Sequence, residues 1–184
     1  MSMCCYQCQE TAKGTGCEIR GVCGKTEDVA KLQDLLIYTL KGIAEIVVKG
    51  KLDVAGLGPV NHEVLRSLFM TITNANFDAA AFEVEIKKML KLRNELRAKI
   101  SAENLHDATT FEVASPEAMQ EKAASVGVLA TKNEDVRSLR ELIIYGVKGM
   151  AAYAEHAYVL GYADDAIFAA MEKAIWRWAR RPQS

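Results

Sequence analysis

The chain has 184 residues, of which 50% are hydrophobic and 26% are charged, and its formal net charge is −1 at pH 7. This composition is typical of one globular domain, or of two small ones. A charge so close to zero excludes the basic surface that nucleic-acid binding requires. No apolar run reaches the roughly 20 residues of a membrane span, so we expect no membrane segment and a cytoplasmic location.

All five cysteines lie within Met1–Gly24. Such crowding is typical of ligands to a metal centre, because one ion or cluster needs several thiolates within a few ångströms. Cys5 and Cys8 form a C-x2-C chelate, and Cys17 and Cys23 follow it in a glycine-rich loop. Four thiolates suit a cubane iron–sulfur cluster or a tetrahedral zinc, and the presence of one short chelate instead of two favours the cluster.

Disulfides are a weaker alternative, because no apolar leader precedes the cysteines and a reducing compartment disfavours bridges. Cys4 is expected to be a spectator, since adjacent residues rarely both reach one cluster. Thr26–Asp28 predicts a helix N-terminus capped by Thr26, which would stabilise a nearby anion by about 0.3–1 kcal/mol. Three cations are either partners of an anionic cluster or ordinary solvated charges: Lys13, Arg20 and Lys25.

Apolar residues recur at three- and four-residue steps through most of the remaining chain, which predicts helices. The first three expected helices cover Glu27–Lys49, Val60–Thr73 and Asp78–Ala102, with a turn at Asn74–Asn76. Pro116 begins a short helix that ends near Gly127, and two further helices cover Glu134–Leu160, capped by Asn133, and Asp164–Ala179. The sole candidate strand, Val126–Ala130, is too short to be convincing.

The sequence of the first long helix is partly repeated later in the chain, because Glu27–Val29 recurs as Glu134–Val136. Further identical residues recur at the same offset, including the pairs Tyr38 and Tyr145, Lys41 and Lys148, and Gly42 and Gly149. Chance similarity between amphipathic helices is the alternative, but the constant offset favours one helix template used twice. Gly42 and Gly149 are expected to let neighbouring helices approach closely.

The sequence therefore predicts an all-α fold with two helical bundles in tandem and a cysteine loop packed at the N-terminal end. The predicted divisions are a cluster-binding loop at residues 1–25, a first helical bundle at residues 26–105 and a second bundle at residues 106–184. The second bundle ends in an atypical tail, Met171–Ser184.

The cysteine segment resembles the N-terminus of the hybrid cluster proteins, which are also called prismane proteins or hydroxylamine reductases. The resemblance rests on Cys5–Lys13, Gly16-Cys17 and Gly21–Lys25, and continues through Leu32–Ile37, Thr71–Asp78 and Asn133–Leu142. It implies that a [4Fe-4S] cluster is held by four ligands: Cys5, Cys8, Cys17 and Cys23. It also implies a first domain built from two three-helix bundles.

The resemblance further implies an oxidoreductase that reduces hydroxylamine or nitric oxide with electrons from a reduced carrier protein or an NADH-dependent reductase. The family's later domains supply a histidine, glutamates and cysteines to a second, hybrid cluster, and this sequence has no cysteine after Cys23. We therefore expect an N-terminal electron-transfer domain that lacks the hybrid-cluster domains and is not catalytically competent alone. The alternatives are a shortened reductase that needs a partner chain and a zinc-stabilised helical module.

The remaining candidate residues have weaker support. The three histidines lie far from the cysteines in sequence and are expected in surface or capping roles: His62, His106 and His156. Tyr6 and Gln7 lie between predicted ligands and are expected to shield the site or to hydrogen-bond to it.

Overall fold

The computed structural model describes residues 3–73 and 75–179, so that Asn74 of the predicted turn and the end of the predicted tail lie outside the described residues. Its helices are α1 (Glu27–Lys49), α2 (Gly58–Ile72), α3 (Ala79–Arg97), α4 (Pro116–Val126), α5 (Glu134–Val159) and α6 (Asp165–Ala179). Short 3-10 turns lie at Ala12–Gly14 (η1), Ala55–Leu57 (η2), Asp107–Thr109 (η3) and Val128–Ala130 (η4). The described residues form no strand beyond a single bridge, which confirms the all-α prediction.

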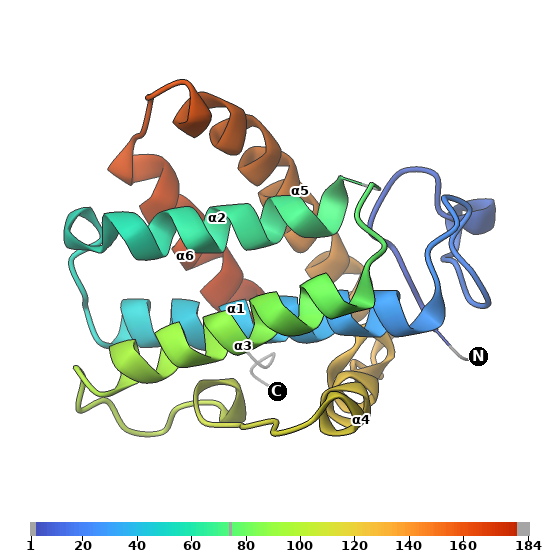
Figure 1. The fold of residues 1–184 in the computed structure, drawn as a ribbon, viewed down its shortest axis with the longest axis horizontal. Helices are drawn as coiled ribbons and strands as arrows, with labels where there is room; N and C mark the ends of the chain where they lie inside the picture. Colours follow the sequence, from blue (N-terminus) through green and yellow to red (C-terminus); the bar gives the residue numbers. More distant parts are fainter. Residues whose placement is uncertain (1–2, 74, 180–184) are drawn as a thin grey trace.

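Helix α1 lies at the centre of the fold. Its apolar side chains are buried around most of the helix, and Leu32, Leu40 and Ile43 are completely inaccessible to solvent. Figure 1 shows α3 running along α1, with α4 below both helices. Helices α5 and α6 lie behind α2 in the same view. Burying each Leu or Ile contributes about 1.5–3 kcal/mol, so α1 supplies much of the stability of the fold.

Gly42 allows the chain to pack directly on α1. A Cβ atom at this position would lie 2.1 Å from the carbonyl oxygen of Ala108 in η3 and 3.2 Å from Cδ of Arg93 in α3. No real Cβ atom tolerates the first distance, so the predicted close approach at Gly42 is confirmed. One turn earlier, the Tyr38 hydroxyl donates a hydrogen bond to the Asp107 carboxylate, which fixes η3 on the same face.

The second copy of the helix template has different surroundings. A Cβ atom at Gly149 in α5 would meet nothing within 4 Å, so the predicted close approach at that position is wrong for the described part of the chain. Helix α2 packs chiefly along α5, and α6 packs between α5 and α1. Helices from the two halves of the sequence are therefore interleaved, and the division at residue 105 stays a prediction.

Two local predictions differ from the structure. Helix α3 ends at Arg97, before the predicted Ala102, because Ile100 leaves the helix and packs over Gly50 at the end of α1. Thr26 occupies the N-cap position of α1, but its side chain accepts no capping hydrogen bond. The segment Val126–Ala130, which was not convincing as a strand, contains the 3-10 turn η4.

The cap at the start of α5 is confirmed, since the Asn133 side chain accepts a hydrogen bond from the Val136 N–H at 3.0 Å. Among the described helices, none combines the length and the apolar character that crossing a membrane requires.

Candidate metal centre

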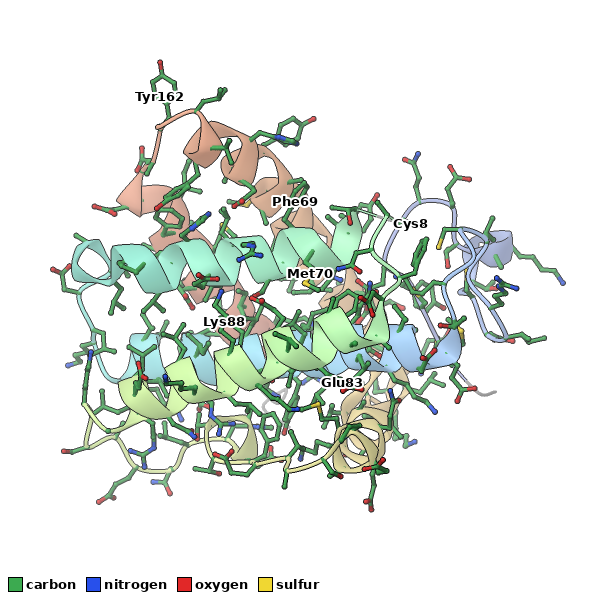
Figure 2. All side chains as sticks on the ribbon, in the orientation of Figure 1. Cys8, Phe69, Met70, Glu83, Lys88 and Tyr162 are labelled. Carbon is green, nitrogen blue, oxygen red and sulfur yellow. The ribbon has the colours of Figure 1, made fainter. Side chains whose placement is uncertain are left out.

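The cysteine loop lies beyond the N-terminus of α1, at one end of the molecule, and Figure 2 places Cys8 in it. Cys5 and Cys17 form an antiparallel bridge in which each N–H donates to the carbonyl oxygen of the other at 3.1 Å. Both residues are buried. The bridge therefore fixes the backbones of two predicted ligands side by side, although eleven residues separate them in the sequence.

The sulfur of Cys17 is surrounded by hydrogen-bond donors. The Ala12 N–H donates to Sγ at 3.4 Å, and the Thr11 hydroxyl lies 3.9 Å from Sγ. Burial alone would raise the pKa of the Cys17 thiol, but hydrogen bonds from the Ala12 and Val22 N–H groups and from Thr11 outweigh it, so the pKa is lowered. A lowered pKa favours the thiolate, which is the form that binds metals.

The sulfur of Cys5 faces a buried cation. The Lys25 ammonium lies 3.7 Å from Cys5 Sγ and also donates to the Gln33 side-chain oxygen. Lys25 is only 1% exposed, whereas Lys13 and Arg20 are exposed. Burial raises the pKa of Cys5, and the Lys25 charge opposes that rise. Of the three cations in the cysteine segment, Lys25 is thus the one in contact with a predicted ligand.

The other two predicted ligands, Cys8 and Cys23, are half-buried. A tight turn surrounds Cys23, because the Gly21 N–H donates to the Lys25 carbonyl at 2.8 Å and a Cβ atom on Gly21 would lie 3.0 Å from Cys23 Sγ. A side chain at Gly21 would thus crowd the sulfur.

Cys4 has different surroundings from the predicted ligands. It lines a hollow with Asp34 and with residues 123–130 of α4 and η4. Burial and the nearby Asp34 carboxylate raise the pKa of the Cys4 thiol to about 11. This environment disfavours a thiolate at Cys4, and the spectator role of Cys4 stays a prediction.

None of the five thiols forms a disulfide. Within the described residues, no three Cys, His, Asp or Glu side chains converge in the geometry of a metal site. The chemistry of the donor set nonetheless fits an iron–sulfur group, because one short segment carries the four predicted ligand thiols, and because an amide N–H contacts the sulfur of Cys17 and an ammonium group contacts that of Cys5. The assignment of Cys5, Cys8, Cys17 and Cys23 as ligands stays a prediction.

A group of charged side chains behind the cysteine loop, in which Lys148 is buried and Asp34 and Glu141 are partly buried, was not predicted from the sequence. The Gln7 side-chain amide donates to Asp34 at 3.3 Å, which links the loop to α1. Burial and the neighbouring Glu141 carboxylate raise the pKa of Asp34, and burial lowers the pKa of Lys148. Asp34 and Glu141 also line a cavity of about 300 Å³. The sequence did contain a signal for this group, because Asp34 and Glu141 place a carboxylate at equivalent positions of the repeated helix template.

The histidines take structural roles in the described part of the chain. The His106 side chain caps η3 by accepting from the Ala108 N–H at 3.1 Å, which confirms a capping role. His62 stacks on Tyr158 with ring centroids 3.8 Å apart, and His156 packs edge-on against Phe69.

The sequence pattern of the prismane/CO dehydrogenase family matches residues 3–184. The chain is 63% identical over 175 residues to a hydroxylamine reductase of Acetivibrio thermocellus, a match that covers 95% of this chain and 32% of that protein. It is 57% identical over 185 residues to a hydroxylamine reductase of Desulfitobacterium hafniense, covering 95% of this chain and 33% of the relative. The corresponding protein of Thermoanaerobacter pseudethanolicus is 52% identical over 180 residues, with 95% and 33% covered. The chain thus spans about a third of the length of the curated relatives it matches, and it corresponds to their N-terminal region.

Proposed function

This chain belongs to the prismane/CO dehydrogenase family, and from that premise we propose that it is the N-terminal electron-transfer domain of a hydroxylamine reductase. In this proposal a [4Fe-4S] cluster is held by four thiolates: Cys5, Cys8, Cys17 and Cys23. The observation that carries the proposal is the bridge between Cys5 and Cys17, in which both sulfurs face hydrogen-bond donors. When bound, such a cluster supplies one-electron redox chemistry.

The buried Lys25 gives the proposal an electrostatic argument. A buried ammonium group is costly unless it is paired, and the hydrogen-bond partners of Lys25 in the structure are a neutral amide and the Cys5 sulfur. A thiolate at Cys5 would provide a counter-charge in direct contact with the ammonium group. The Lys25 position is therefore what we expect if Cys5 is deprotonated in the functional protein.

The loop residues around Cys17 support the same role. The Ala12 N–H points at the sulfur, and the Thr11 hydroxyl donates to the Cys5 carbonyl at 2.9 Å, which stiffens the loop between the two cysteines. Hydrogen bonds to ligand sulfurs raise the potential of an iron–sulfur group, and a rigid loop reduces the rearrangement that accompanies electron transfer.

We further propose that the electrons come from a reduced carrier protein or an NADH-dependent reductase. Reduction of hydroxylamine would require the part of the relatives' chain that lies outside the matched region. Turnover of hydroxylamine with a reduced dye as donor, when this chain is combined with a separate chain that supplies the second cluster, would instead support the alternative of a shortened reductase that needs a partner chain.

Cysteine variants test the ligand assignment. After anaerobic preparation, Cys17→Ser is expected to lose the visible cluster absorbance while its far-ultraviolet circular dichroism stays helical. Cys4→Ser is the matched control, because Cys4 lies in the same loop outside the proposed ligand set, and this variant should keep the absorbance. A Cys17→Ser protein with full absorbance would overturn the assignment.

A further inference from the structure

Helix α5 exposes a continuous row of large apolar side chains. Leu139, Leu142 and Tyr153 are 61%, 68% and 84% exposed, and Met150 lies on the same side of the helix. Their three-, four- and seven-residue separations place them on one face, together with Gly149. We refer to Leu139, Leu142, Gly149, Met150 and Tyr153 as the α5 face. An exposed apolar surface of this kind marks an interaction site.

The repeated helix template shows that this face is built to be covered. Leu139, Leu142 and Tyr153 correspond to Leu32, Leu35 and Ile46 in α1, and these three α1 residues are completely buried. Met150 corresponds to Ile43, which is also fully buried. The two helices thus carry apolar side chains at equivalent positions, and what differs is the cover.

The opposite side of the template is buried in both copies. Ile37 and Ile144 are each 4% exposed, and Ala44 and Ala151 are each fully buried. Helices α2 and α6 cover this side of α5. The side of α5 that carries Ile144 and Ala151 is therefore packed in the same way as the equivalent side of α1. Within the described residues, the α5 face has no such neighbour.

The cover of α1 indicates what a matching cover for α5 would look like. Helix α3 packs along α1, and the turn η3 sets the Ala108 carbonyl directly against Gly42. Asp107 of the same turn accepts the hydrogen bond from Tyr38. The counterparts of Gly42 and Tyr38 in α5 are Gly149, which has open space around it, and Tyr145, which is partly exposed.

We propose that the α5 face docks a helix-and-turn segment supplied by the part of a hydroxylamine reductase chain that lies outside the region matched here. The segment would carry apolar residues every three or four positions, a turn whose backbone rests on Gly149, and an oxygen acceptor for the Tyr145 hydroxyl. This chain spans only 32% of the Acetivibrio thermocellus relative, so about two thirds of that protein remain to provide such a segment.

The repeat favours this occupant over a second copy of the chain. The α1 template is covered by a helix together with a 3-10 turn that projects a backbone carbonyl into the space above Gly42. A second copy meeting the first through the α5 face would present another α5, which has no such turn. Figure 2 also shows Tyr162, just beyond the end of α5, projecting away from the molecule.

The test uses a fusion protein in which this chain replaces the matched region of the Acetivibrio thermocellus reductase and is followed by the rest of that protein. Amide hydrogen exchange at residues 142–153 is expected to slow at least about tenfold in the fusion relative to the chain alone, because a covered helix opens less often. Leu142→Asp should abolish the slowing. The matched control is Val84→Asp, which changes a side chain that is 66% exposed on α3 and should leave the slowing intact.

Unchanged exchange at residues 142–153 in a folded fusion would overturn the proposal. If the fusion does not fold, overlapping synthetic peptides of roughly 40 residues, each long enough for two average helices, replace it and together span the part of the relative outside the matched region. At least one peptide should bind the chain and bind Leu142→Asp at least about tenfold more weakly, and absence of binding by every peptide would overturn the proposal. The chain alone could instead form a dimer that Leu142→Asp dissociates. That result would assign the α5 face to a second copy and would also overturn the proposal. The inference rests on the proposed place of this chain in a hydroxylamine reductase, but none of these readouts depends on iron, so its failure can be distinguished from failure of the proposed electron-transfer role.

Discussion

Two glycines at equivalent positions of the repeated helix should respond to alanine with opposite signs. In an open helix position, replacing Gly by Ala gains about 1 kcal/mol of helix propensity. At Gly149, where a Cβ atom meets nothing within 4 Å, Gly149→Ala should realise that gain. At Gly42 the new Cβ atom would lie 2.1 Å from the Ala108 carbonyl oxygen, and backbone atoms must move to relieve the clash.

The size of the Gly42 effect follows from what the clash displaces. Overpacking a core costs about 1–3 kcal/mol, and a shift of η3 also weakens the Tyr38–Asp107 hydrogen bond, a bond to a charged group worth about 1.5–3 kcal/mol. After subtracting the propensity gain, Gly42→Ala should lose about 2 kcal/mol. For a chain of 184 residues this lowers the melting temperature by about 4–8 °C, whereas Gly149→Ala should raise it by about 2–4 °C.

Thermal unfolding followed by circular dichroism, with urea unfolding as a second measurement, compares the two variants with the unaltered chain. Each variant is the control for the other, because both change glycine to alanine at the same position of one helix template. A Gly42→Ala protein as stable as the unaltered chain would refute the close approach of η3 to α1. A loss of stability in Gly149→Ala would refute the open surroundings of α5.

Two further predictions concern buried charge, and a third concerns the hydrogen bond of Tyr38 to the exposed Asp107 carboxylate. Both Glu172 carboxylate oxygens are buried and have no hydrogen-bond partner among the described residues, and burial raises the pKa of Glu172 from 4.5 to about 8. The folded state therefore holds a proton that the unfolded state releases, so stability should fall by about 1.4 kcal/mol per pH unit as pH rises from 4.5 to about 8. Urea unfolding at several pH values should show Glu172→Gln with a shallower slope, and an equal slope would contradict this origin. Lys25→Met should lower the reduction potential of the iron-loaded protein in a redox titration, whereas Lys13→Met, which changes an exposed charge, should not; equal potentials would remove Lys25 from the site. Tyr38→Phe should lower the free energy of unfolding by about 1.5–3 kcal/mol at pH 7, and no change would show that the Asp107 bond is not formed.

The helices could be predicted from the sequence because local signals agreed with their final packing. Helix α1 runs from Glu27 to Lys49, as its apolar pattern predicted, and Asn133 caps α5. The end of α3 could not be predicted, because it is set by the contact of Ile100 with Gly50, which are distant in sequence. A pattern that is local to one helix does not contain this contact.

The repeat gave a correct sequence relationship and one wrong structural expectation. Gly42 and Gly149 both follow a Tyr by four residues and a Lys by one in their helices. Within the described residues, however, only Gly42 is contacted by a turn from elsewhere in the chain. Close approach depends on the covering segment as much as on the glycine. The repeat predicts which face of a helix is suited to packing, but it does not say whether the described chain supplies the partner.

At the candidate metal centre, cysteine spacing predicted which thiols lie in one loop, but it could not separate the three nearby cations. The sequence gives no reason to choose between Lys13, Arg20 and Lys25 as the cation next to a ligand. Only the folded structure shows that Lys25 is buried against Cys5 and Gln33. The partly buried Asp34 and the buried Lys148 were missed for a related reason. Charged residues on a helix are normally solvated, and their burial depends on how α1, α5 and η4 meet.

The most direct test of the proposed electron-transfer role is the iron, sulfide and zinc content of the chain purified without oxygen, with a visible spectrum before and after dithionite. The proposal predicts about four irons and four sulfides per chain, with absorbance that bleaches on reduction. One zinc ion with no sulfide would contradict it, and the cysteine loop would then be a structural zinc clamp on a helical domain.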